Sequence, residues 1–134
     1  DNEEGRVFCL ISDGELDCPS TWSSLLFANH HKLNNLVLII NNNGLQACGY
    51  KKDIIDVGDL RAKFEAFDWQ YDEADGHDFI DLEFLLQKRN IQRPLVINAK
   101  TIKGKGISFA ENNNAWHYNN LTGELYERAM KENA

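Results

Sequence analysis

Two short polar segments hold the side chains best suited to bind a charged ligand. In the first, the carboxylate of Asp13 stands beside Gly14, whose missing side chain would let a ligand approach the backbone. The second, at residues 41–44, contains three asparagines and a glycine, and the backbone carbonyl of Leu45 follows it. Both segments come directly after an apolar run, so each stands where a buried strand would end.

Oxygen atoms dominate these two segments, and this limits the metal ions that they could bind. Carboxylate, amide and carbonyl oxygens without imidazole or thiolate favour Mg²⁺ or Ca²⁺. A single carboxylate, that of Asp13, leaves most of the charge of a divalent ion unneutralised. The pattern therefore favours Mg²⁺ that also holds phosphate oxygens, and a diphosphate is the natural complement.

The elements that must position these segments alternate between strand and helix. Strands are predicted at residues 7–11, 36–40, 68–71 and 95–99, and helices at residues 19–32, 60–67, 78–88 and 123–131. Residues 101–120 show neither period and are expected to form a long loop. This order predicts an α/β fold, a mostly parallel sheet with helices on both faces, in a single domain over residues 1–134. Ligands of such sheets bind beyond the carboxyl ends of the strands, where both polar segments lie.

Composition excludes several classes of function. The 134 residues carry 14 basic and 21 acidic side chains, a formal charge of −7, so nucleic acid and acidic membranes are not expected partners. The longest apolar runs are far shorter than the roughly 20 residues of a membrane span. Three cysteines without CxxC spacing argue against a disulfide framework or a zinc site and indicate a reducing, cytoplasmic compartment. The chain begins with Asp1 and not Met, so we expect a fragment.

Four ordered elements of the chain resemble transketolases. Residues 12–16 (SDGEL) followed by residues 42–46 (NNGLQ) resemble the thiamine diphosphate signature, which opens with GDG and closes with a double Asn. Between them, residues 32–36 (KLNNL) resemble the KLxNL segment of transketolases. Downstream, residues 100–106 (KTIKGKG) and the Trp-His pair at 116–117 resemble elements of the transketolase N-terminal subunit.

The resemblance implies a thiamine diphosphate-binding fold and a set of ligands. It implies that the side chains of Asp13 and Asn43 bind Mg²⁺, with the carbonyl of Leu45 as a third protein ligand. Gly14 would offer its backbone N–H to the diphosphate. His117 falls on a family histidine near the cofactor and the sugar substrate, where it assists binding and proton transfer.

Each assignment has a plainer alternative in the residues themselves. The Asp-Gly and Asn-Gly pairs could be ordinary turns, and His117 could be an exposed loop residue. Lys103 and Lys105 could attract phosphate or could be solvated charges of the loop. His77 is expected to be a turn residue, and Cys9 is expected to be an inert part of the core.

The chain also departs from the pattern that it resembles. Ser12 stands where transketolases have Gly, Pro19 where they commonly have Gly, and Cys18 where they commonly have a Glu used at the contact between subunits. A transketolase N-terminal subunit is about twice as long, so upstream cofactor contacts and the pyrimidine-binding domain are expected to be missing. We therefore expect an unpaired sheet edge and partner chains that complete the site.

Two classes of function remain open. The first is the Mg²⁺- and diphosphate-binding half of a transketolase-like enzyme, which works in an oligomer with a pyrimidine-domain partner subunit and moves a two-carbon ketol unit between sugar phosphates. A related alternative is the synthase of 1-deoxyxylulose phosphate, but residues 15–16, Trp22 and residues 32–36 favour transketolase. The second class is a non-catalytic binding or assembly module, which Cys18, Pro19 and the short length favour.

Overall fold

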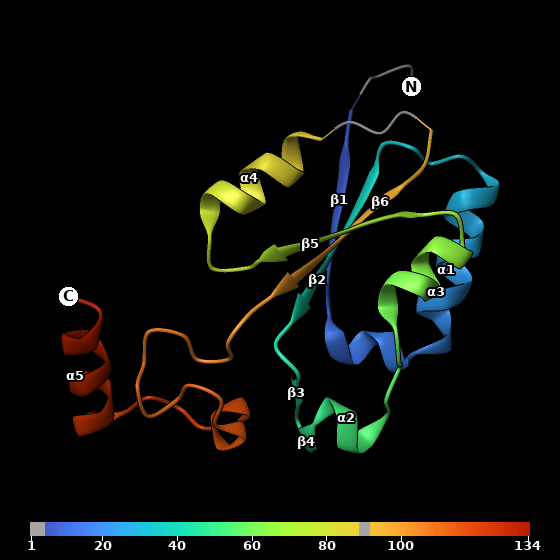
Figure 1. Ribbon diagram of the computed structural model, residues 1–134. Helices are drawn as coiled ribbons and strands as arrows, with labels where there is room; N and C mark the ends of the chain where they lie inside the picture. The colour runs from blue at the N-terminus through green and yellow to red at the C-terminus, as the bar shows by residue number, and fades with distance from the viewer. Residues whose placement is uncertain (1–4, 89–91) are drawn as a thin grey trace.

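A parallel sheet forms the centre of the molecule (Figure 1). The computed structural model describes residues 5–88 and 92–134, and within them this sheet has four strands. In spatial order they are β1 (Val7–Ser12), β2 (Leu36–Asn42), β6 (Leu95–Lys100) and β5 (Gln70–Asp75). Every neighbouring pair runs parallel, so the predicted mostly parallel sheet is confirmed.

Helices cover both faces of this sheet, as predicted. The helices are α1 (Pro19–His30), α3 (Leu60–Ala66) and α4 (Phe79–Gln87). On one face α1 and α3 bury Leu25 and Phe64, and on the other α4 buries Leu85. Not every apolar residue of these helices is buried, since Leu26 is 57% and Phe79 is 86% exposed. Successive residues of a strand face opposite sides, so β2 and β6 serve both cores with continuous apolar runs.

Several short elements connect the sheet to its helices and were not predicted. They are the 3₁₀ turns η1 (Asp13–Asp17) and η2 (Asn114–His117), the hairpin strands β3 (Leu45–Gln46) and β4 (Gly49–Tyr50), and α2 (Lys51–Ile54). Each is too short to show a hydrophobic period, which needs a window of about 11 residues or more for a helix. The hairpin and α2 follow the second polar segment directly, so they shape the surroundings of the candidate site.

Strand β1 differs from the buried strand that its sequence predicts. Among the described residues it pairs with β2 alone, and its side chains Phe8 and Leu10 are 53% and 69% exposed. Cys9, which was expected in the core, is exposed for the same reason. An apolar run in the sequence predicts a strand, but it does not show whether another element packs against that strand. The result agrees with the open sheet edge that was expected.

Strand β5 begins and ends later than predicted. It runs Gln70–Asp75, whereas residues 68–71 were expected. The prediction ended too early because the second half of β5 is acidic, and acidic residues are depleted in strands. The acids are tolerated because β5 lies at the edge of the sheet and they have cationic partners. Lys88 lies 3.3 Å from Asp72, and Lys100 lies 2.6 Å from Glu73.

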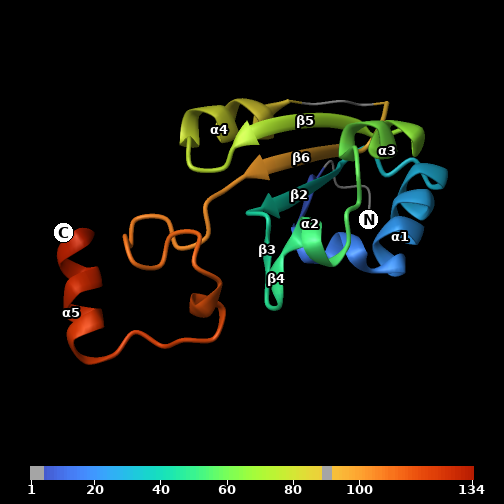
Figure 2. The same cartoon turned by 60° about the horizontal axis from the view of Figure 1, so that its bottom comes forward.

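The C-terminal part of the described chain lies beside the sheet, as Figures 1 and 2 show. Residues 101–122 form the predicted long loop, interrupted by η2, and lead into α5 (Gly123–Glu132). Glu132 fastens this helix to the loop, because its Oε2 accepts the backbone N–H of Ser108 at 2.6 Å. None of the helices within the described residues is long and apolar enough to cross a membrane.

Candidate metal and diphosphate site

The first polar segment forms the turn η1 at the carboxyl end of β1. Glu15 closes the start of this turn, since its Oε2 accepts the backbone N–H of Ser12 at 2.8 Å. Leu16 anchors the other side, because it is 1% exposed and its carbonyl accepts the indole N–H of Trp22 at 2.8 Å. Asp13, the first residue of the turn, is therefore held in one direction.

Asp13 points inward and meets the second polar segment. Its side chain is 1% exposed, and its Oδ2 accepts the backbone N–H of Gly44 at 2.7 Å. Strand register explains this contact, because Ser12 of β1 pairs with Asn41 of β2 and the two segments leave the sheet side by side. Gly44 has a φ of +72°, a conformation that favours glycine. Both segments were expected beyond the carboxyl ends of the strands, and the structure brings them into contact there.

Asn43 uses its side chain to shape its own turn. Its Oδ1 accepts the backbone N–H of Leu45 at 2.9 Å, and an amide oxygen has a second lone pair that could meet a cation. Within residues 5–88 and 92–134, no group of three His, Cys, Asp or Glu side chains gathers that could hold a metal. A divalent ion here would need the mixed oxygens of Asp13, Asn43 and Leu45, and this ligand set remains a prediction.

A half-buried acid joins η1 to the hairpin after the second segment. Asp17 accepts a hydrogen bond from Nε2 of Gln46 at 2.7 Å through Oδ2, while its Oδ1 is buried and has no partner among the described residues. Buried oxygens of this kind are rare, so the orphaned atom fits a site that takes a further cation, donor or water. A Cβ on Gly14 would lie 3.4 Å from the side chain of Gln46, which is an ordinary van der Waals distance, so the turn and the hairpin lie side by side here. Its contact with a diphosphate remains a prediction.

Lys51 supplies a buried cation that the sequence analysis missed, because two adjacent lysines look like solvated charges. Its residue is 8% exposed, and its backbone N–H donates to the carbonyl of Gly44 at 2.9 Å. Burial lowers the pKa of the Lys51 ammonium, while the carboxylates of Asp13, Asp17 and Asp56 act to raise it. The candidate site therefore contains both the acid expected for a metal and a lysine near it.

His117 lies in η2, which packs against the β3 strand of the same hairpin. Asn114 fixes that packing, since its Nδ2 donates to the carbonyl of Ala47 at 3.0 Å. The imidazole of His117 is exposed, and its ring lies edge-on to that of Tyr118 with centroids 5.0 Å apart. The fold thus brings the element that carries His117 to the hairpin beside the site, while its catalytic role remains a prediction.

Comparison with known protein families decides what kind of domain this is. Residues 2–132 match the family described as transketolase, thiamine diphosphate binding domain. The chain belongs to the transketolase family. The resemblance inferred from the ordered motifs is therefore confirmed.

Transketolases and their subunits are also found among the most similar individual proteins. The chain is 38% identical over 130 residues to an apulose-4-phosphate transketolase subunit from Actinobacillus succinogenes, covering 95% of this chain and 46% of that protein. It is 33% identical to a 6-deoxy-6-sulfo-D-fructose transketolase subunit of a Clostridium species, covering 98% and 49%. The chain thus spans about half the length of these curated relatives. The crystal structure of Campylobacter jejuni transketolase superimposes with a TM-score of 0.86 at 26% identity, over 96% of this chain and 20% of that one.

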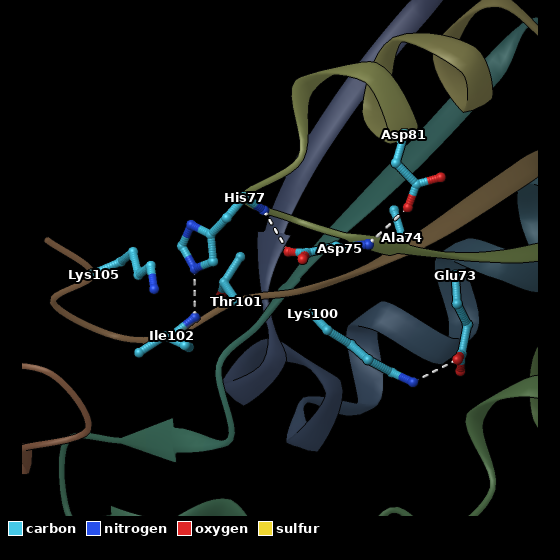
Figure 3. Close-up of a pocket in the computed structure, with 9 residues that line it drawn as sticks. All are labelled: Glu73, Ala74, Asp75, His77, Asp81, Lys100, Thr101, Ile102 and Lys105. Carbon is cyan, nitrogen blue, oxygen red and sulfur yellow. Dashed lines mark hydrogen bonds and ion pairs between the residues drawn. The ribbon is translucent and has the colours of Figure 1, made fainter.

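A cavity of this transketolase-family chain, of about 510 Å³, lies at the carboxyl ends of β5 and β6. His77 joins the two ends (Figure 3): its backbone N–H donates to Oδ1 of Asp75 at 2.9 Å, and its Nε2 accepts the backbone N–H of Ile102 at 2.8 Å. The predicted turn residue therefore also holds the loop after β6. Lys105 is exposed and lies 3.9 Å from Glu111, which agrees with a solvated charge of that loop.

A chain of polar side chains crosses the transketolase-family sheet from Asn42 of β2 to Glu73 of β5. Asn42 donates to Asn98 at 2.9 Å, Asn98 donates to the hydroxyl of Tyr71 at 2.8 Å, and that hydroxyl donates to Glu73 at 3.0 Å. Burial, and then the hydrogen bond to Glu73, raises the pKa of Tyr71 to about 12. The hydrogen-bonded ammonium of Lys100 is the main cause that lowers the pKa of Glu73.

Proposed function

We propose that this chain contributes the Mg²⁺- and diphosphate-binding half of a transketolase, which transfers a two-carbon ketol unit between sugar phosphates. The contact between Asp13 and Gly44 carries the proposal, because it joins the two polar segments at one end of a parallel sheet. That end is where ligands bind in α/β folds. The match of residues 2–132 to a thiamine diphosphate binding domain supports the same ligand.

Each residue of the site has a defined part in this proposal. The Asp13 carboxylate, the Asn43 amide and the Leu45 carbonyl hold Mg²⁺ through oxygen, which is the chemistry that this ion prefers. Gly14 offers its backbone N–H to the diphosphate. His117 binds the sugar and accepts or donates a proton at its hydroxyl. Thiamine diphosphate supplies the carbanion chemistry when it is bound.

Partner chains complete the enzyme in this proposal. The Actinobacillus succinogenes relative is named as one subunit of its transketolase, which supports a multi-subunit assembly, and its name includes a phosphorylated sugar. A pyrimidine-domain partner subunit would supply the groups that act on the aminopyrimidine ring. The exposed apolar side chains of β1, including Leu10, leave a surface that an oligomer could cover.

A non-catalytic binding module of the same fold is the second candidate. Cys18 favours it, because this residue is exposed and stands where the resemblance implies a carboxylate at the contact between subunits. Such a module would bind the cofactor without turnover. The two candidates therefore differ in an activity measurement and agree in a binding measurement.

Calorimetry of thiamine diphosphate binding, with Mg²⁺ and with EDTA, tests the shared part of both candidates. We expect binding that depends on Mg²⁺, loss of that dependence in Asp13→Ala, and no loss in Asp53→Ala, which removes an exposed acid. Equal affinity with and without Mg²⁺, or an Asp13→Ala variant that keeps the dependence, would show that the metal assignment is wrong.

A ketol-transfer assay after addition of a pyrimidine-domain chain separates the enzyme from the module. The enzyme proposal expects turnover that falls in His117→Ala through a lower kcat/KM for the donor sugar. Cofactor binding without turnover in the reconstituted complex supports the module. An unchanged kcat/KM in His117→Ala refutes the proton-transfer role of that residue.

A further inference from the structure

Lys51 stands next to the candidate site without an assigned role. We propose that the Lys51 ammonium couples the two ligands of the site: it attracts the diphosphate and weakens Mg²⁺ binding at Asp13 until the diphosphate is present. This inference rests on the proposed function, since it concerns the same metal and the same anion. Lys51 would thereby determine the order of binding, with the diphosphate before Mg²⁺.

The position of Lys51 is the first argument. Its backbone N–H donates to the carbonyl of Gly44 at 2.9 Å, and the N–H of that glycine donates to Asp13 at 2.7 Å. One residue, Gly44, thus joins the lysine and the acid through its own two backbone groups. This connection fixes the backbone of Lys51 beside the site.

The surroundings of the ammonium are the second argument. Lys51 is 8% exposed and lines a cavity of about 270 Å³, with Asn42 and Gly44 of the second polar segment in the same wall. Among the described residues, its Nζ has neither a hydrogen bond nor an ion pair within 4.0 Å, although the carboxylates of Asp13, Asp17 and Asp56 act on its charge, and Asp56 lines the same cavity. The ammonium of this buried residue has no direct partner among the described residues, and such a charge favours an anion in the adjacent cavity.

The neighbouring Lys52 provides a matched comparison. It lines the same cavity, but its side chain is exposed, so water screens its charge from the site. The charge of Lys51 acts through a less polar medium and over a short distance. Coulomb interactions there are several times stronger than at the surface.

The coupling follows from the sign of this charge. A divalent cation at the Asp13 carboxylate is repelled by the Lys51 ammonium, whereas a diphosphate is attracted by it. Once the diphosphate is bound, its negative charge offsets the lysine, and Mg²⁺ enters a site that is no longer repulsive. Removal of the lysine charge must therefore strengthen the binding of one ligand alone and weaken that of the other.

Titration calorimetry with Mg²⁺ alone, and with inorganic pyrophosphate alone in EDTA, tests this coupling. In Lys51→Met, which keeps the apolar stem, we expect Mg²⁺ to bind about five- to tenfold tighter and pyrophosphate about five- to tenfold weaker. Lys52→Met should change either affinity less than about twofold, because its charge is screened. Lys51→Arg keeps the charge, so its affinities for Mg²⁺ and for pyrophosphate should stay close to those of the unmodified chain.

Opposite changes in the two affinities identify a charge effect, since a loss of folding would weaken both. Thermal unfolding of each variant accompanies the titrations, and Lys51→Gln replaces Lys51→Met if the latter unfolds. Affinities in either variant that are unchanged, or that move in the same direction, overturn the inference and leave the proposed function standing. An unmodified chain that binds neither probe overturns both.

Discussion

The Oδ2 atom of Asp13 lies 2.7 Å from the backbone nitrogen of Gly44, although 31 positions separate the two residues in the chain. This contact serves both structure and the proposed chemistry. It closes the turn after β1 against the turn after β2, and it holds a buried carboxylate against the backbone of the second segment. Substitutions at Asp13 can therefore separate the two roles.

We predict that Asp13→Ala lowers the free energy of unfolding by about 1–3 kcal/mol, because the Gly44 N–H loses its acceptor. Asp13→Asn keeps a carbonyl oxygen that can accept the same hydrogen bond, so its loss of stability should be smaller. Both variants should lose Mg²⁺-dependent binding, since an amide is a poorer ligand than a carboxylate. Urea unfolding and calorimetry measure the two effects, and equal destabilisation by Ala and Asn would contradict the structural role.

Tyr71 provides a prediction at alkaline pH. Its pKa is raised to about 12, chiefly by burial, so the neutral hydroxyl is favoured in the folded chain. The stability from this preference is fully present below the ordinary pKa of 10.0 and is lost as pH rises toward 12. Absorbance titration at the tyrosinate band should show a step near pH 12 that is absent from Tyr71→Phe. The control Tyr118→Phe, which removes a tyrosine that is 73% exposed, should keep that step.

Glu73 and Lys100 provide the corresponding prediction at acid pH. The pKa of Glu73 is lowered from 4.5, first by its hydrogen bond to Lys100, so the stabilisation is present above 4.5 and is lost as pH falls through the lower folded value. Lys100→Met should lower the free energy of unfolding at neutral pH by less than about 1 kcal/mol, since both side chains are partly exposed. The difference from the unmodified chain should shrink below pH 4.5.

The control for this pair is Lys105→Met, because Lys105 lies 3.9 Å from Glu111 at the surface. That variant should change the free energy of unfolding little at either pH. Denaturant unfolding at several pH values supplies the data. A Lys100→Met deficit that grows as pH falls would have the wrong sign for the proposed ion pair.

The order and type of the main elements could be predicted because they depend on local patterns. The apolar runs of β2 and β6 are continuous, as expected for strands buried on both faces, and Asp78 caps α4 by accepting the backbone N–H of Ile80 at 2.8 Å. The exposure of Cys9 could not be predicted, since it depends on which elements cover β1. The acidic end of β5 was missed because its stability comes from distant partners such as Lys100.

The residues of the candidate site also fall into those that the sequence predicts and those that it does not. Asp13 and the Asn43 turn could be predicted because each is a local signal at the end of an apolar run. Their placement at the carboxyl ends of parallel strands was expected, and strand register explains the contact between the two turns. Lys51 and the pairing of Asp17 with Gln46 could not be predicted, because both depend on the fold of a hairpin too short to leave a pattern.

The loop after β6 contains a glycine, Gly104, whose backbone conformation and close contact should contribute to the stability of the fold. Gly104 has a φ of +73°, and a Cβ there would lie 2.6 Å from the carbonyl oxygen of Ala110, so alanine meets both strain and a backbone clash. Gly58 has a φ of +64° with nothing within 4 Å of its Cβ position, so alanine there meets strain alone, about 1–2 kcal/mol. We predict that Gly104→Ala lowers the free energy of unfolding more than Gly58→Ala does. Urea unfolding of both variants measures the difference, and equal losses would mean that the loop moves freely away from Ala110.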